Sequence, residues 1–389
     1  MTSKERVRST LNHRAPDRVP IDFGSTAVTG MHVSCVAGLR SHYGLEEHPV
    51  KVWEPYQMLG EIEEDLADVL GVDTAALPAP KTIFGFRNEN WKTFRAPWGQ
   101  EVLVSEHFRT TGATDGGLLL YPEGDLEAEP SGHMPAGGYF FDTIIRQDPI
   151  DEDALDPEDN LEEFKPLSEA DLQHYRDQAG RLASTHRAVV GGVGGTAFGD
   201  IALVPAPFLK KPRGIRDIEE WYISTAVRQD YLHEVFSRQL VIALENLQRV
   251  HEAVGEVIDV LFVCGTDFGT QASTFCSTTT FDSLYAPYYR AINEWVHTNT
   301  NGRPSLFPAE RSPPHPAFHR MRLRYREPGS MLCGWHGSGG AEGETRRPHR
   351  FLGWGRGYPE DAPVRDSGRG QGRGPATLRD LLGPRRICL

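Results

Sequence analysis

Apolar and polar residues alternate in two different periods along the first 300 residues. Continuous apolar runs predict buried strands, most clearly at Ala188–Gly192 and Val257–Val263. Further strands are expected at Val19–Phe23 and Val72–Leu77, and alternation around Trp98-Gly99 predicts a hairpin over Thr93–Arg109. Helical spacing predicts helices over Lys4–Asn12, Val33–Tyr43, Tyr56–Leu70, Leu167–His186, Ile215–Val254 (two helices) and Phe281–Thr298.

This recurrence of strand, loop and helix favours a parallel sheet with right-handed crossovers. The chain has no nucleotide-binding fingerprint and is long enough for a large domain. We therefore expect an α/β protein built as a (β/α)8 TIM barrel.

Composition changes abruptly after Asn301. Residues 302–389 contain no lysine but 16 Arg, 15 Gly and 11 Pro, and they carry a formal charge of +8 within a chain of net charge −13. We therefore expect a partial barrel domain at 1–301, incomplete because 302–389 is an unstructured segment translated out of frame. The alternative is a natural Arg/Gly/Pro-rich tail.

Codon arithmetic supports the frameshift. When Phe351–Pro363 is back-translated and read one base later, the permitted codons include F-W-G-G-G-V-D-T-Q-K-T-L-P. Similar shifts of His319–Tyr325 and Glu327–Met331 permit I-E-C-G-F-D-I and N-P-V-Q-C. Gly302–Ser305 needs another phase, which permits W-K-T-F. Two single-base losses, near Asn301 and near Pro313, would explain both phases.

Charge and cysteine content exclude several classes. The acidic first part argues against nucleic-acid binding. The chain has no apolar run of 18 residues and no signal-peptide core, so we expect no membrane span and a cytoplasmic location. The five cysteines lack CxxC spacing, and 1–301 has no HxH or HExxH motif, so no metal ligands are assigned from motifs. A small-molecule substrate is expected.

Three aspartates at the ends of predicted strands are the candidate catalytic residues. In a barrel, the loops after the strands form the active face. Asp267 follows the most apolar strand among glycines and small hydroxyls, and Asp22 and Asp73 stand at or inside predicted strands. We expect the three carboxylates to converge on one cavity at the carboxyl end of the barrel. The alternative for Asp267 is capping of the following turn.

Other polar residues are weaker candidates for substrate binding. Gln271 could hydrogen-bond substrate or satisfy its own loop, and His32 could bind substrate or metal or be a solvated loop histidine. Glu54, next to Trp53, could likewise bind substrate or be a solvated residue. The glycines of 191–195 follow a strand, but they lack phosphate-loop spacing and predict a close backbone approach instead.

Two segments resemble the uroporphyrinogen decarboxylase superfamily, especially its corrinoid-dependent methyltransferase-like branch. Lys4–Pro20, with the sequence K-E-R-V-R-S-T-L-N-H-R-A-P-D-R-V-P, is similar to the family's opening. Val263–Gln271 resembles its G-D-D-L-G-T-Q loop, with Thr266 in place of the first Asp, which implies substrate binding by Thr266. Phe281–His297 and the peptides that the shifted reading frame permits are also similar to this family. The resemblance implies a (β/α)8 barrel.

Departures from the family favour methyl transfer over decarboxylation. The decarboxylases carry arginines in the loop after the first strand, whereas Phe23–Gly30 has none, and Leu77–Pro80 replaces their aspartate-bearing turn. The resemblance implies zinc, a corrinoid and a corrinoid protein partner for an intact methyltransferase, with zinc ligands in the segment after the last helix. Uroporphyrinogen decarboxylation and a non-catalytic or pseudogene product remain the alternatives.

Overall fold

The computed structural model describes residues 1–263, 266–269 and 274–300, and this part of the chain is mixed α/β. The helices are α1 (Ser3–Leu11), α2 (Val33–His42), α3 (Glu64–Leu70), α4 (Glu169–Leu182), α5 (Ile218–Val227), α6 (Gln229–Val254), α7 (Thr278–Thr280) and α8 (Ala286–Asn299). Short helical turns are η1 (Ala27–Thr29), η2 (Pro122–Gly124), η3 (Pro157–Asn160), η4 (Gly255–Val257) and η5 (Phe281–Tyr285). In these ranges, none of the helices has the length and apolar character that a membrane span needs.

The strands form three small sheets. They are β1 (Val50–Glu54), β2 (Leu59–Gly60), β3 (Thr74–Leu77), β4 (Lys92–Arg95), β5 (Glu101–Val104), β6 (Thr110–Gly112), β7 (Leu118–Leu120), β8 (Gly132–Met134), β9 (Asp142–Thr143), β10 (Ala188–Gly192) and β11 (Val260–Phe262). Their orders are β2-β1-β5-β4, β6-β7-β8-β9 and β11-β10-β3.

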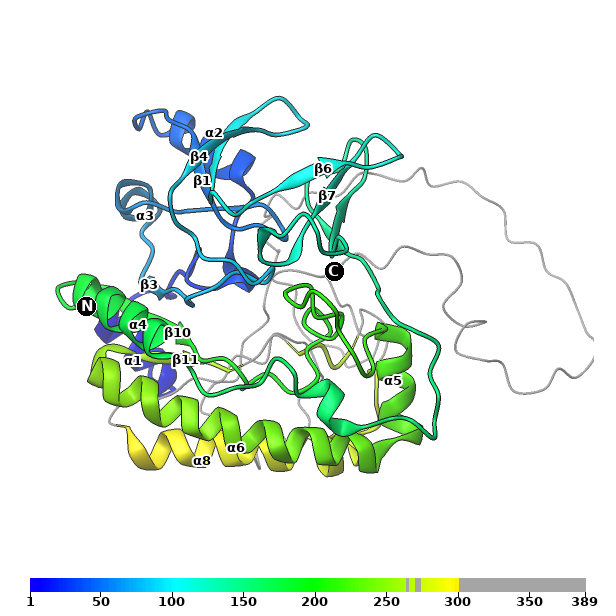
Figure 1. Ribbon diagram of the computed structural model, residues 1–389. Coiled ribbons are helices and arrows are strands. Elements are labelled where there is room, and N and C mark those ends of the chain that lie inside the picture. The colour runs from blue at the N-terminus through cyan, green and yellow to red at the C-terminus, as the bar shows by residue number, and fades with distance from the viewer. Residues whose placement is uncertain (264–265, 270–273, 301–389) are drawn as a thin grey trace, which may run out of the picture. The chain divides into compact units, whose positions relative to one another are not determined.

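The sheet β11-β10-β3 is parallel throughout. Val190 lies opposite Val260 on one side and opposite Ala76 on the other. Parallel strands are typically buried on both faces, and the first four residues of β10 are indeed buried. Helix α6 has buried residues along one face and lies beside α8 (Figure 1), where the two helices pack together. The main apolar core includes residues of both helices and of this sheet.

The other two sheets are mainly antiparallel and share a second apolar core. Only the pair β1 and β5 is parallel. The predicted hairpin is confirmed as β4 and β5, and its turn contains Gly99 at φ +88°, a left-handed conformation that favours glycine. Buried side chains of the second core include Val52, Phe84 and Phe141.

The predicted fold class is confirmed at the level of α/β architecture. The described residues contain three adjacent parallel strands but no closed barrel. The expectation for 302–389 lies outside the described residues. Two predicted elements are wrong: Val19–Phe23 is not in a strand, and the helix expected over Tyr56–Leu70 begins only at Glu64. Residues before it turn instead, with Met58 at φ +53°, so that β2 can pair with β1.

Candidate functional site

The loops that follow β10 and β11 lie together at the carboxyl end of the parallel sheet. Thr196 Oγ1 donates to the Val263 carbonyl at 2.6 Å and so joins the two loops. Gln239 of α6 donates from Nε2 to the Gly195 carbonyl at 2.8 Å. Gly195 has φ +94°, and a Cβ there would lie 3.5 Å from the Ala243 Cα. Gly195 therefore brings the glycine loop into van der Waals contact with α6.

Thr266 is buried at this end of the sheet, in the loop after β11. Its hydroxyl lies 2.8 Å from the Tyr289 hydroxyl and 3.2 Å from the Phe198 carbonyl. Tyr289 OH also donates to the Phe198 carbonyl at 3.3 Å. These bonds hold the loops after β10 and β11 against α8, so the structure gives the Thr266 hydroxyl a positioning role.

Asp267 lies next to Thr266 in the same loop. The neighbouring Phe268 is buried, with its ring centroid 5.0 Å from those of Phe281 and Tyr285. This packing fixes the backbone that carries Asp267 at the carboxyl side of β11. Gln271 lies outside the described residues.

Asp73 lies at the amino end of β3, and the expectation that it lies at the carboxyl end is wrong. Its fully buried carboxylate forms ion pairs with Arg6 and Arg18, each with an N to O distance of 2.6 Å. It also accepts hydrogen bonds from Ser3 Oγ at 2.8 Å and from the Ile21 amide at 2.9 Å. Burial alone would raise the pKa of Asp73, but these hydrogen bonds outweigh it and lower the pKa. This is the pattern of a structural anion.

Asp22 lies beside Asp73 rather than beside Asp267. Its carboxylate accepts 2.6 Å hydrogen bonds from Ser25 Oγ and from Thr74 Oγ1, and Thr74 is the first residue of β3. Burial raises the pKa of Asp22, although both hydroxyl donors oppose the shift.

The three predicted aspartates therefore do not meet at one end of the sheet. Thr74 of β3 pairs with Ala188 of β10, and Phe262 of β11 pairs with Gly192 of β10. Gly192 lies four residues further along β10 than Ala188. At about 3.3 Å per residue, these two pairs are about 13 Å apart. Asp22 and Asp73 belong to the amino side, whereas Asp267 follows β11 on the carboxyl side.

Glu54 is a buried carboxyl at the carboxyl end of β1. It accepts hydrogen bonds from the backbone amides of Tyr56 and Gln57 at 2.8 Å and 2.9 Å. These two amides do not offset the loss of hydration, and burial raises the pKa of Glu54 from 4.5 to about 7. Burial and the nearby Asp142 and Glu54 carboxylates raise the pKa of Tyr56 to about 12. A carboxyl that titrates near neutral pH is suited to proton transfer.

His32 is the N-cap of α2, and both of its ring nitrogens are engaged. Nδ1 accepts from the Ser34 amide at 3.2 Å, which leaves the proton on Nε2, 3.0 Å from the Tyr139 carbonyl. The ring also lies 5.0 Å from that of Trp98, and burial lowers the pKa of His32. In this arrangement, His32 positions α2 and the Tyr139 segment.

Sequence reasoning missed the cationic partners of Asp73 and the role of Tyr289. Arg6 and Arg18 were visible as part of the basic opening segment, but nothing local connects them to a residue more than 50 positions away. Comparisons with known proteins add no assignment: no protein-family model, curated protein or solved structure matches the chain.

Proposed function

We propose that the chain is a member of the uroporphyrinogen decarboxylase superfamily and that its intact form is a cobalamin-linked methyltransferase with a (β/α)8 barrel. The observation that carries the proposal is the parallel order β3, β10, β11, with the loop of Thr266 and Asp267 at its carboxyl end. Barrel enzymes place chemistry at this end. The sequence resemblance of the same loop supplies the superfamily.

The surroundings of the first loop support methyl transfer over porphyrinogen decarboxylation. Eight substrate carboxylates would require compensating cations. Phe23–Gly30 has no basic side chain, and the residue that precedes it, Asp22, carries a carboxyl group. The nearby Arg6 and Arg18 already form ion pairs with Asp73.

The described residues do not fit the zinc site that the resemblance implies. The two described cysteines are Cys35, exposed on α2, and Cys276, whose pKa burial raises to about 11. Thr266 and Asp267 offer no nitrogen or sulfur ligand. The expected zinc ligands fall after the last helix, outside the described residues.

Two proteins test the proposal. One is the chain as encoded, and the other has one base restored near the codon for Asn301 and one near that for Pro313. We expect loss of methylcobalamin in the presence of a thiol only with the frame-corrected protein. Coproporphyrinogen formation by either protein would contradict the substrate class, and methyl transfer by the encoded chain would contradict the frameshift.

The second candidate is a non-catalytic product of the same gene. It rests on the absence of a closed barrel in the described residues, since open sheet edges remain unpaired. Resequencing across the codons for Asn301–His315 separates the two candidates. A gene sequence that encodes residues 301–389 of the present chain without any base loss would favour the non-catalytic product.

A further inference from the structure

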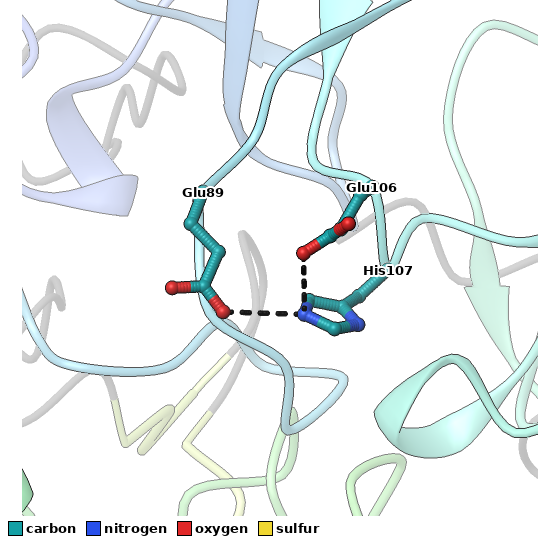
Figure 2. Close-up of side chains that lie close together, drawn as sticks. All are labelled: Glu89, Glu106 and His107. Atoms are coloured by element: carbon teal, nitrogen blue, oxygen red, sulfur yellow. Dashed lines mark hydrogen bonds and ion pairs between the residues drawn. The ribbon is translucent and has the colours of Figure 1, made fainter.

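Two carboxylates and an imidazole converge at the open end of the β4–β5 hairpin. His107 Nε2 lies 3.2 Å from Glu89 Oε1 and 3.4 Å from Glu106 Oε1 (Figure 2). One possible ligand atom from each of the three residues lies within 4.8 Å of the other two. The cluster is separate from the loops on which the proposed function rests.

The segments that lead out of the hairpin stay joined beyond its last strand pair. Lys92 pairs with Val104 at the end of the ladder, and Asn90 beyond it has φ +48°, so the regular register ends there. The Glu106 amide still donates to the Glu89 carbonyl at 3.2 Å, one residue out of that register. The two segments are therefore held together before any ligand binds.

Additional bonds fix the side chains and the turn. Asn90 Nδ2 donates to Glu106 Oε1 at 2.6 Å. Ser105 Oγ donates to the Arg87 carbonyl at 2.6 Å and accepts from the His107 amide at 3.3 Å. Such support matters because a metal site needs its ligands oriented by surrounding hydrogen bonds.

The distances match the edges of a small coordination polyhedron. Two ligand atoms that each lie about 2.1 Å from a tetrahedral zinc ion are about 3.4 Å apart. The two edges at His107 already have this length. The third edge, between the two carboxylates, is no longer than 4.8 Å.

The charges also favour a cation. The two carboxylates bring two negative charges beside an imidazole, and Lys92 Nζ donates to the Glu106 carbonyl at 2.8 Å rather than to its carboxylate. One nitrogen and two oxygen ligands suit borderline divalent ions such as zinc. We infer that Glu89, Glu106 and His107 bind a divalent transition metal ion, with open positions toward solvent, and that the ion clamps the end of the hairpin.

The experiment titrates the metal-free full chain with ZnCl2, by calorimetry and by thermal unfolding. We expect His107→Ala and Glu89→Gln each to weaken one zinc-binding event at least about tenfold, a loss of about 1.4 kcal/mol. Zinc should raise the Tm of the parent protein more than that of either variant.

The chain offers a matched control. His133 lies 3.0 Å from Asp115 Oδ2 with a similar exposure, but it belongs to no described three-ligand cluster. His133→Ala should leave zinc binding unchanged. If His107→Ala and Glu89→Gln, with unaltered circular dichroism, bind zinc as the parent protein does, the three residues form only ion pairs and the inference is wrong. The same conclusion follows if His133→Ala weakens binding equally.

Discussion

The buried carboxyl of Glu54 should make the stability of the protein fall as the pH rises toward neutrality. Its pKa is about 7 in the folded protein, against an ordinary value of 4.5. Between these values, the folded protein holds a proton that the unfolded chain has released, so a rise in pH favours unfolding. At about 1.4 kcal/mol per pH unit, the interval amounts to about 3 kcal/mol. Above pH 7, the folded protein has lost the whole of this contribution to its free energy of unfolding.

Glu54→Gln removes this titration. The amide oxygen can still accept from one of the Tyr56 and Gln57 amides, so the variant loses about 1 kcal/mol of hydrogen bonding at every pH. We expect it to be slightly less stable than the parent protein at pH 4.5 and about 2 kcal/mol more stable at pH 8.

Urea unfolding at several pH values measures the effect. The difference in free energy of unfolding between variant and parent should change by about 3 kcal/mol between pH 4.5 and pH 8. The control is Glu47→Gln, a substitution at an exposed glutamate, which should give a constant difference. If the Glu54→Gln curve also stays parallel to that of the parent, Glu54 does not carry a raised pKa and the reasoning is refuted.

Three further substitutions test the positioning contacts. Asp73→Asn should cost about 3 kcal/mol at pH 7 in urea unfolding, because it removes the anion that pairs with the buried Arg6 and the more exposed Arg18; since the pKa of Asp73 is lowered, the difference in free energy of unfolding should narrow below about pH 4. Thr266→Val should cost about 1 to 2 kcal/mol, and a cycle with Tyr289→Phe should show coupling; additive effects would contradict the hydrogen bond. Gly195→Ala should cost about 1 to 2 kcal/mol through its positive φ, whereas Gly194→Ala, which has open space for a Cβ, should be near neutral; equal Tm losses would contradict this.

Local signals predicted most elements of the fold. The five residues Ala188–Gly192 form β10 with the predicted bounds, and the long amphipathic segment of α6 is a helix as expected. The helix predicted over Tyr56–Leu70 was wrong in its first half because periodicity cannot show strand pairing. Leu59 and Gly60 pair with β1, and this non-local bond overrides the helical spacing of the apolar residues.

The candidate site was less predictable, because the role of each carboxylate depends on partners that lie far away in the sequence. Asp73 stands beside an apolar strand, as Asp267 does, and sequence position alone gives both the same expectation. The ion pairs to Arg6 and Arg18 cross 67 and 55 residues, so only the fold shows that Asp73 is neutralised.

The comparison of Asp73 with Glu54 gives a physical criterion for choosing among buried carboxyls. Both are nearly inaccessible to solvent, so both bear the cost of lost hydration. Two guanidinium groups offset that cost at Asp73 and lower its pKa, whereas Glu54 has two neutral amides and its pKa rises. A proton can therefore leave and return near pH 7 at Glu54 but not at Asp73. Of these two carboxyls that the sequence singles out, Glu54 is the one whose surroundings permit acid and base chemistry.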